Sequence, residues 1–159
     1  MKKAILIILV FLNPLLFAQV DFERKSIKGN QIKLSEHYEK GAVILSFWAL
    51  WCQPCRTELV KINNLYEKYS DKGLSVVSVN IDSPRSIAKV KSYIVSHNIK
   101  FPVIKDPQKN LLQEFNGLSI PYLLVINNEG EIVSRHIGYV PGDEIKLEKE
   151  INSVLGGNK

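Results

Sequence analysis

The feature that most limits the folds open to this chain is a near-continuous apolar run, AVILSFWAL, at residues 42–50. A strand of this composition has to be buried on both faces, which places it inside a sheet covered by helices. The only two cysteines of the chain, Cys52 and Cys55, follow directly. Apolar residues then recur at helical spacing, in a stripe formed by Leu59, Ile62, Leu65, Tyr66 and Tyr69. The two thiols are therefore predicted at a junction between a buried strand and a helix.

The rest of the chain alternates predicted strands and helices. Residues 22–27 and 31–34 flank the turn Lys28-Gly29-Asn30, which predicts an N-terminal hairpin. Ser83 and Asp143 are predicted N-caps of two later helices. This order predicts an α/β fold with a central mixed β-sheet, antiparallel at one end and flanked by helices. The other predicted strands are residues 74–81, 101–104, 122–126 and 131–138, and the predicted helices follow Ser83-Pro84, cover 108–115 and end at Gly156-Gly157.

The first 18 residues have the pattern of a secretory signal peptide. Lys2 and Lys3 precede a hydrophobic segment at residues 4–12, and the small residue Ala18 offers a cleavage point. A retained membrane anchor is the alternative, but the apolar stretch, residues 4–17, is shorter than the roughly 20 residues that a span needs. We therefore expect a signal peptide at residues 1–18 and a location in the periplasm or cell envelope.

About 140 residues remain after cleavage, which is enough for one compact core and too few for two. A single domain is expected at residues 20–157. The whole chain has 21 Lys+Arg against 16 Asp+Glu, and removal of Lys2 and Lys3 leaves 19 against 16. This charge is mild and scattered, so nucleic acid is not an expected partner.

The position of the C-x-x-C pair suggests thiol chemistry. Cys52 lies where unpaired backbone N–H groups and the positive end of a helix dipole stabilise a thiolate. Such a thiolate attacks a disulfide in another molecule, and a second thiol three positions later, Cys55, resolves the mixed disulfide.

Three other uses of the cysteines compete with this one. A zinc site needs four ligands, and the remaining candidates, His37, His97 and His136, are far apart in the sequence. Covalent haem attachment needs C-x-x-C-H, and position 56 is Arg. A structural disulfide stays open, although a bridge across so small a loop removes little chain entropy.

Glu58 falls on the same helical stripe as Ile62, Leu65 and Tyr69. A carboxyl group there is expected to be at least partly buried near the thiols. Desolvation and a nearby thiolate would both raise its pKa and make it a proton carrier during thiol exchange. The alternative is an ordinary first-turn glutamate favoured by the helix dipole.

The chain contains the segments FWALWCQPCRTEL and SIPYLLVINNEGEIVSRHIG. Together they resemble the TlpA/ResA group of periplasmic thioredoxin-like proteins, AhpC/TSA-related members of the thioredoxin superfamily. The resemblance implies a thioredoxin-like fold, with Cys52 as the exposed nucleophile, Cys55 as the buried resolving cysteine and Glu58 as the active-site acid. The family pattern is carried here by Phe47, Trp48, Trp51, Cys52, Pro54, Cys55, Pro121, Asn127, Gly130 and Gly138.

The resemblance also implies a client-binding surface, with a cis peptide bond between Ile120 and Pro121 facing the cysteines. Proline offers no N–H and would cover the dithiol, while the Ile120 backbone would pair with an extended client segment. Trp51 and Pro54 complete the expected client-binding residues. A trans proline that only begins a strand is the alternative.

One segment resembles the helix-and-strand insertion that distinguishes this group from minimal thioredoxins: residues 84–104, between the C-x-x-C helix and the expected cis-proline. The chain departs from the common family pattern at Tyr122, where Thr is usual, and at Ser119, where Gly is often found. These departures leave the catalytic assignment intact and bear on the choice of client.

The sequence as a whole predicts an exported thiol–disulfide oxidoreductase that reduces disulfides in envelope proteins, such as apocytochrome c or copper-centre proteins. The expected partners are these clients and a membrane thiol-electron donor of the DsbD/CcdA kind. No cofactor or metal is expected beyond the redox-active pair Cys52 and Cys55, and the protein is expected to be a monomer. The alternatives are a peroxiredoxin-like thiol peroxidase and a copper-binding chaperone that would add His136 to the two cysteines.

Overall fold

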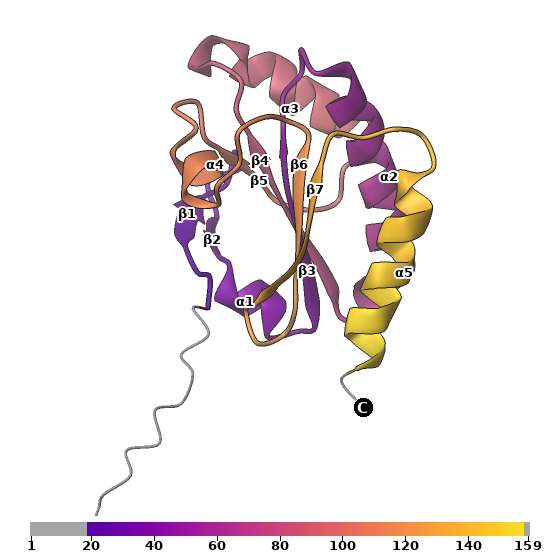
Figure 1. Ribbon diagram of the computed structural model, residues 1–159. Helices are drawn as coiled ribbons and strands as arrows, with labels where there is room; N and C mark the ends of the chain where they lie inside the picture. Colours follow the sequence, from indigo (N-terminus) through magenta and orange to yellow (C-terminus); the bar gives the residue numbers. More distant parts are fainter. Residues whose placement is uncertain (1–18, 158–159) are drawn as a thin grey trace, which may run out of the picture.

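The structure is a computed structural model that describes residues 19–157 (Figure 1). The predicted signal peptide, residues 1–18, lies outside the described residues. Within residues 19–157, no helix has the length and apolar character needed to cross a membrane. The strands are β1 Glu23–Lys25, β2 Gln31–Lys33, β3 Ala42–Trp48, β4 Leu74–Asn80, β5 Val103–Lys105, β6 Tyr122–Ile126 and β7 Ile132–Ile137. The α-helices are α1 Ser35–Tyr38, α2 Gln53–Tyr69, α3 Ile87–Ser96, α4 Asn110–Glu114 and α5 Asp143–Gly156, and the 3₁₀ turns are η1 Ser70–Lys72 and η2 Pro84–Ser86.

The central sheet has five strands in the order β5-β4-β3-β6-β7. Strands β3, β4 and β5 are parallel, whereas β6 and β7 pair antiparallel, which confirms a mixed sheet with an antiparallel end. Every residue of β3 and β4 is buried, as expected of strands covered on both faces. In β7, at the edge, half-buried and exposed residues alternate.

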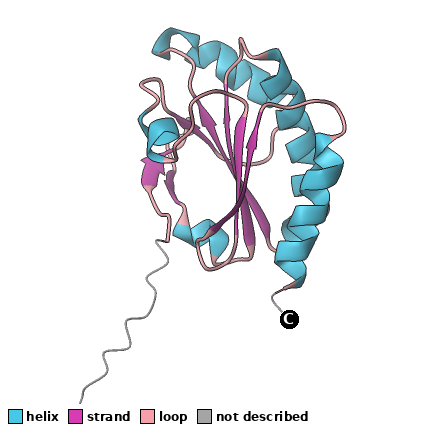
Figure 2. Cartoon of the chain, viewed as in Figure 1, coloured by secondary structure: helices cyan, strands magenta, loops and turns pink. Residues whose placement is uncertain are grey.

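Helices cover the sheet on both sides (Figures 1 and 2). Helices α2, α3 and α5 lie on one face, and α1, α4 and the N-terminal hairpin lie on the other. This arrangement is the thioredoxin-like fold that the sequence predicts. Helix α3 and strand β5 form the predicted insertion, and they extend the sheet beyond β4.

The predicted N-terminal hairpin is present as the separate two-stranded sheet of β1 and β2. The chain beyond β1 reaches the edge of the main sheet, because Ser26 bridges Ile104 and the Ile27 amide donates to the carbonyl of Val103 at 2.8 Å. The segment that follows β1 therefore pairs with the inserted strand β5 at the edge of the main sheet.

Three local predictions need correction. Helix α1 was not predicted, because four residues are too few to show a helical period. Ser83 precedes the 3₁₀ turn η2 and makes no capping hydrogen bond, so the α-helix begins only at Ile87. Asp143 is the first residue of α5, and Gly142 takes the N-cap position with a φ of 109°. Only glycine adopts such a backbone readily, which is why glycine and not the aspartate occupies the cap position.

Candidate functional site

The cysteine pair lies where β3 ends and α2 begins. Cys52 is the N-cap of α2 and is joined to Cys55 by a disulfide bond. The Cys55 amide donates a hydrogen bond to the Cys52 sulfur at 3.3 Å. An N-cap side chain normally accepts such a bond through oxygen, and here the sulfur occupies that position. In the reduced protein the same N–H group and the helix dipole favour a Cys52 thiolate.

Both cysteines are largely covered by the protein. Cys52 is 6% exposed and Cys55 is fully buried. Cys52 is thus the more accessible of the two. The expected exposure of Cys52 is nevertheless wrong, because the surrounding residues cover all but 6% of it. Two residues close to Cys52 in the sequence are exposed, Trp51 at 68% and Pro54. A client that reaches Cys52 is therefore expected to contact these two side chains.

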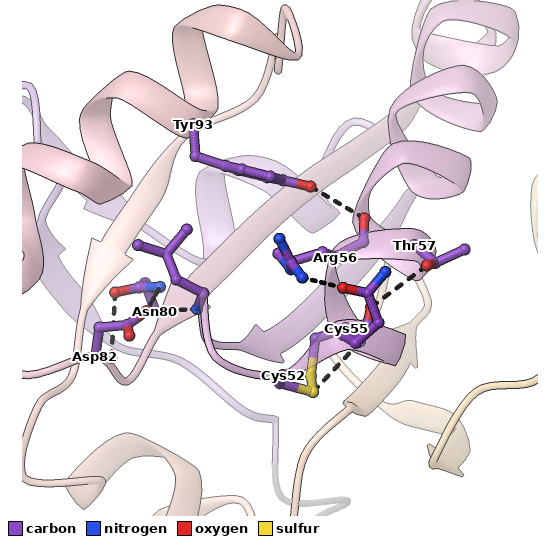
Figure 3. The surroundings of a disulfide bond; sticks show 9 residues. Cys52, Cys55, Arg56, Thr57, Asn80, Asp82 and Tyr93 are labelled. Atoms are coloured by element: carbon purple, nitrogen blue, oxygen red, sulfur yellow. Dashed lines mark hydrogen bonds between the residues drawn. A yellow bond between two sulfur atoms is a disulfide. The ribbon is translucent and has the colours of Figure 1, made fainter.

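Asp82 supports the loop that carries the cysteines. Its Oδ2 atom accepts hydrogen bonds from the Leu50 amide at 2.7 Å and from Asn80 Nδ2 at 2.8 Å (Figure 3). Asp82 follows β4, the parallel neighbour of β3, and is 7% exposed. The buried carboxylate therefore fixes the segment between β3 and Cys52. Asp82 was not among the predicted site residues, although its place just after the predicted strand 74–81 was a usable signal.

The peptide bond between Ile120 and Pro121 is cis, as the resemblance implies. Strand β6 pairs antiparallel with β3, with Tyr122 opposite Phe47, so Pro121 comes at the end of the sheet where the cysteines lie. Pro121 is buried and Ile120 is half-buried. Tyr122, the residue that departs from the family pattern, is buried and donates its hydroxyl hydrogen to the carbonyl of Phe115 at 2.9 Å.

Glu58 lies one turn beyond Cys55 on the buried side of α2. It is 5% exposed, and its Oε2 atom has no hydrogen-bond partner in the described part of the chain. Desolvation raises the pKa of Glu58 to about 8, and the negative charge of Asp143 adds to this effect. The sequence predicted a raised pKa from burial; Asp143 is a contributor that it missed. At neutral pH the Glu58 carboxyl therefore holds its proton.

A small cavity of about 20 Å³ adjoins Glu58. This volume is about what one water molecule needs. The cavity lies between α2, β6, β7 and α5, and its lining includes His136, Tyr139, Asp143 and Glu144. Glu58 therefore lies where the cysteine helix α2 comes close to the loop that joins β7 to α5.

Glu144 at the rim of this cavity has the opposite protonation preference. Hydrogen bonds from the Tyr139 hydroxyl and from backbone amides, including that of Gly142, lower its pKa to about 2. Lys61 lies 3.2 Å from the Glu144 carboxylate. One carboxyl group that keeps its proton and one that stays ionised are thus arranged around the same cavity. The contacts of Glu144 with Lys61 and Tyr139 were not predicted, because Lys61 lies far from Glu144 in the sequence.

The comparisons with known proteins agree with this geometry. A family model described as the AhpC/TSA family matches residues 18–135. The thiol-disulfide oxidoreductase ResA of Geobacillus kaustophilus is 30% identical over 130 residues, which are 82% of this chain and 73% of the relative. The sporulation thiol-disulfide oxidoreductase A of Bacillus subtilis is 29% identical over 126 residues, 79% of this chain and 75% of the relative. A solved structure with a similar fold is the crystal structure of a Chlorobium tepidum protein described as a thiol:disulfide interchange protein DsbE. The two chains superpose with a TM-score of 0.79 and are 30% identical, and the match includes 87% of this chain and 95% of the Chlorobium tepidum chain.

The chain belongs to the AhpC/TSA family. More narrowly, it is a thiol–disulfide oxidoreductase of the ResA and DsbE type, with Cys52 and Cys55 as its C-x-x-C disulfide.

Proposed function

We propose that this protein is exported and reduces disulfide bonds in client proteins of the cell envelope. The observation that carries the proposal is the helix N-terminus at Cys52, where the Cys55 amide already donates to the sulfur. That geometry favours a thiolate at neutral pH, and the thiolate is the form that attacks disulfides. The signal-peptide pattern of residues 1–18 supports export of a single domain, residues 20–157.

In the first step the Cys52 thiolate attacks one sulfur of the client disulfide. A new bond forms between Cys52 and that sulfur, the client S–S bond breaks, and the other client sulfur leaves as a thiolate. The half-buried Ile120 and the buried cis Pro121 lie at the same end of the sheet. Exposed Trp51 and Pro54 flank the reacting sulfur, and these four residues form the surface that receives the client.

In the second step Cys55 attacks the Cys52 sulfur and releases the second client thiolate. Cys55 is fully buried, so its thiol needs a nearby base to lose its proton. Glu58 lies on the same buried side of α2 and holds a proton at neutral pH, so it can serve as this base only after it has given that proton to the first client thiolate. The carboxylate that remains then takes the Cys55 proton, and its raised pKa matches that of a thiol more closely than the pKa of an exposed carboxyl would. The client gains two electrons and two protons, and the protein ends as the disulfide. One of these protons comes from Cys55 by way of Glu58, and the second comes from water because Cys52 begins as a thiolate.

The disulfide form must be reduced again before the next cycle. An oxidising compartment does not supply those electrons, so a membrane thiol-electron donor of the DsbD/CcdA kind is the proposed partner. The proposed clients are apocytochrome c or copper-centre proteins. The reaction as written needs no cofactor or metal, and one chain carries every group in it, which supports a monomer as the working unit.

The first test is the reduction potential of the Cys52 and Cys55 couple, measured by equilibration of residues 19–159 with defined dithiol/disulfide buffers. A value near or below about −250 mV supports a reductase, whereas a value near −120 mV means an oxidant and contradicts the proposed direction. In cells, Cys55→Ser is expected to accumulate mixed disulfides with clients, and Cys52→Ser is the control that forms none. Disulfide reduction that persists in Cys52→Ser would contradict the mechanism.

The two alternatives predict different outcomes. A thiol peroxidase would turn over hydrogen peroxide with Cys52 as the only essential cysteine. A copper chaperone would bind Cu(I) with His136 as a ligand, but His136 Nε2 lies 2.8 Å from Glu150 Oε2, on the edge strand β7. Disulfide reduction without peroxide turnover or His136-dependent copper binding would favour the proposed function over both.

A further inference from the structure

A groove of about 380 Å³ lies between α2 and the inserted helix α3. One wall is aromatic, because the rings of Tyr93 and His97 stack at 3.9 Å and Tyr93 packs against the buried Trp48 at 5.6 Å. The Tyr93 hydroxyl donates to the Arg56 carbonyl at 3.2 Å and ties α3 to the first turn of α2 (Figure 3). The groove is thus a fixed feature of the inserted unit.

The groove begins next to the reacting sulfur. Gln53, which follows Cys52 directly, is part of its lining, and so is Arg56, the residue after Cys55. The end of the groove at Gln53 therefore lies beside Cys52. This position is on the α3 side of α2, away from the Glu58 cavity on the α5 side.

The charges around the groove are of one sign. Residues 83–105 contain no Asp or Glu. Lys61, which also lines the groove, is paired with Glu144, but Arg56 takes part in no ion pair among residues 19–157. The Arg56 Nε atom is buried without a hydrogen-bond partner, and the terminal nitrogen contacts the Gln53 side chain. The charged residues that line the groove are thus Arg56 and Lys61, both basic.

The opposite side of the cysteine helix is acidic. Asp143 and Glu144 supply negative charge there, around the small cavity, whereas Glu58 keeps its proton. A client chain that crosses the disulfide would therefore meet a positive region on the α3 side and a negative region on the α5 side. Such a distribution selects the direction and the register of an extended charged chain.

We propose that the groove between α2 and α3 binds an acidic segment of the client, next to the client cysteine that Cys52 attacks. The Arg56 guanidinium pairs with an Asp or Glu carboxylate, for which its planar fork is suited. The aliphatic part of the bound segment packs against the Tyr93 and His97 wall. The inference rests on the proposed function and adds the chemical class of the client.

Two disulfide-containing peptides test this inference. They differ only at the two residues that flank the attacked cysteine, which are Glu in one peptide and Gln in the other. The measured quantity is the ratio of kcat/KM for reduction of the Glu peptide to that of the Gln peptide by the dithiol protein. We expect a ratio of about five, the factor given by an ion pair of about 1 kcal/mol. The ratio should fall to about one in Arg56→Gln, drop below one in Arg56→Glu, and decrease with added salt.

Arg135→Gln is the matched control, because Arg135 is an exposed arginine on β7 and lines a different hollow. It should keep the ratio of the original protein. Equal rates for the two peptides with the original protein, or a ratio that Arg56→Glu leaves unchanged, would overturn the inference.

A failure of the proposed function gives a different result, since neither peptide is then reduced. In that case the linear Glu peptide is titrated into the disulfide form by calorimetry. Binding that Arg56→Glu abolishes supports the groove as an acidic-peptide site, and the absence of binding overturns it.

Discussion

The substitution Glu58→Gln should stabilise the folded protein at neutral pH. Below about pH 4.5 both the folded and the unfolded chain hold the Glu58 proton, so the group has no effect on the pH dependence of stability. Between 4.5 and the folded pKa of about 8, only the folded chain holds the proton. The unfolded state then gains about 1.4 kcal/mol for each pH unit, so stability falls as the pH rises.

At pH 7 this effect amounts to about 3 kcal/mol of lost free energy of unfolding. The glutamine side chain cannot ionise, and it keeps the size and polarity of the protonated carboxyl group. The Glu58→Gln variant is therefore expected to match the original protein near pH 4.5 and to exceed it by about 3 kcal/mol at pH 7. A residue that lowers stability at its working pH is typical of a functional group.

The assay is urea unfolding of the disulfide form at pH 4.5, 5.5, 6.5 and 7.5. Glu67→Gln is the matched control, because Glu67 is exposed on the same helix. Its free energy of unfolding should follow that of the original protein at every pH. Parallel curves for the original protein and Glu58→Gln would refute the assignment of a neutral buried carboxyl to Glu58.

Two further substitutions test contacts that the fold creates. Asp143→Asn removes the negative charge that helps to raise the pKa of Glu58, so the pH at which the folded chain loses the Glu58 proton should move down. The same urea series, extended to pH 9, measures it as the pH above which stability stops falling, and an unchanged value would contradict the contact. Gly73→Ala should destabilise the protein by more than about 1 kcal/mol, because a Cβ atom there would lie 2.5 Å from a backbone carbonyl oxygen at a φ of 100°. Gly29→Ala is its control, with a similar φ of 96° and no atom within 4 Å of the added Cβ. Equal urea midpoints for the two alanine variants would show that the close approach at Gly73 costs nothing.

The predicted elements that agree best with the structure are those with strong local patterns. The run at residues 42–50 contains the central strand β3, and residues 122–126 match β6 without a shift. Both are continuous apolar runs, and such a run has few stable alternatives to a buried strand. The shorter elements were predicted with shifted ends, because their boundaries depend on turns and caps as much as on period.

The functional residues divide in a similar way. Cys52, Cys55 and Glu58 were found because they share one helix, where fixed spacing relates position in the sequence to position in space. Asp82, Asp143 and Arg56 acquire their roles from neighbours on other elements. For Asp82 the parallel pairing of β3 and β4 was the missing information, and for Arg56 it was the packing of α3 beside α2.

The sequence by itself determined the alternation of strands and helices, the position of the dithiol at a helix N-terminus and the burial of one acid beside it. These are short-range properties, set by side-chain period and by the hydrogen-bonding groups of the local backbone. Only the tertiary structure decided that the acidic residues at the start of α5, Asp143 and Glu144, face Glu58, and that a basic groove forms on the other side of the same helix. Electrostatic interactions depend on distance in space, and that distance between remote segments is fixed only when the sheet and its helices pack together.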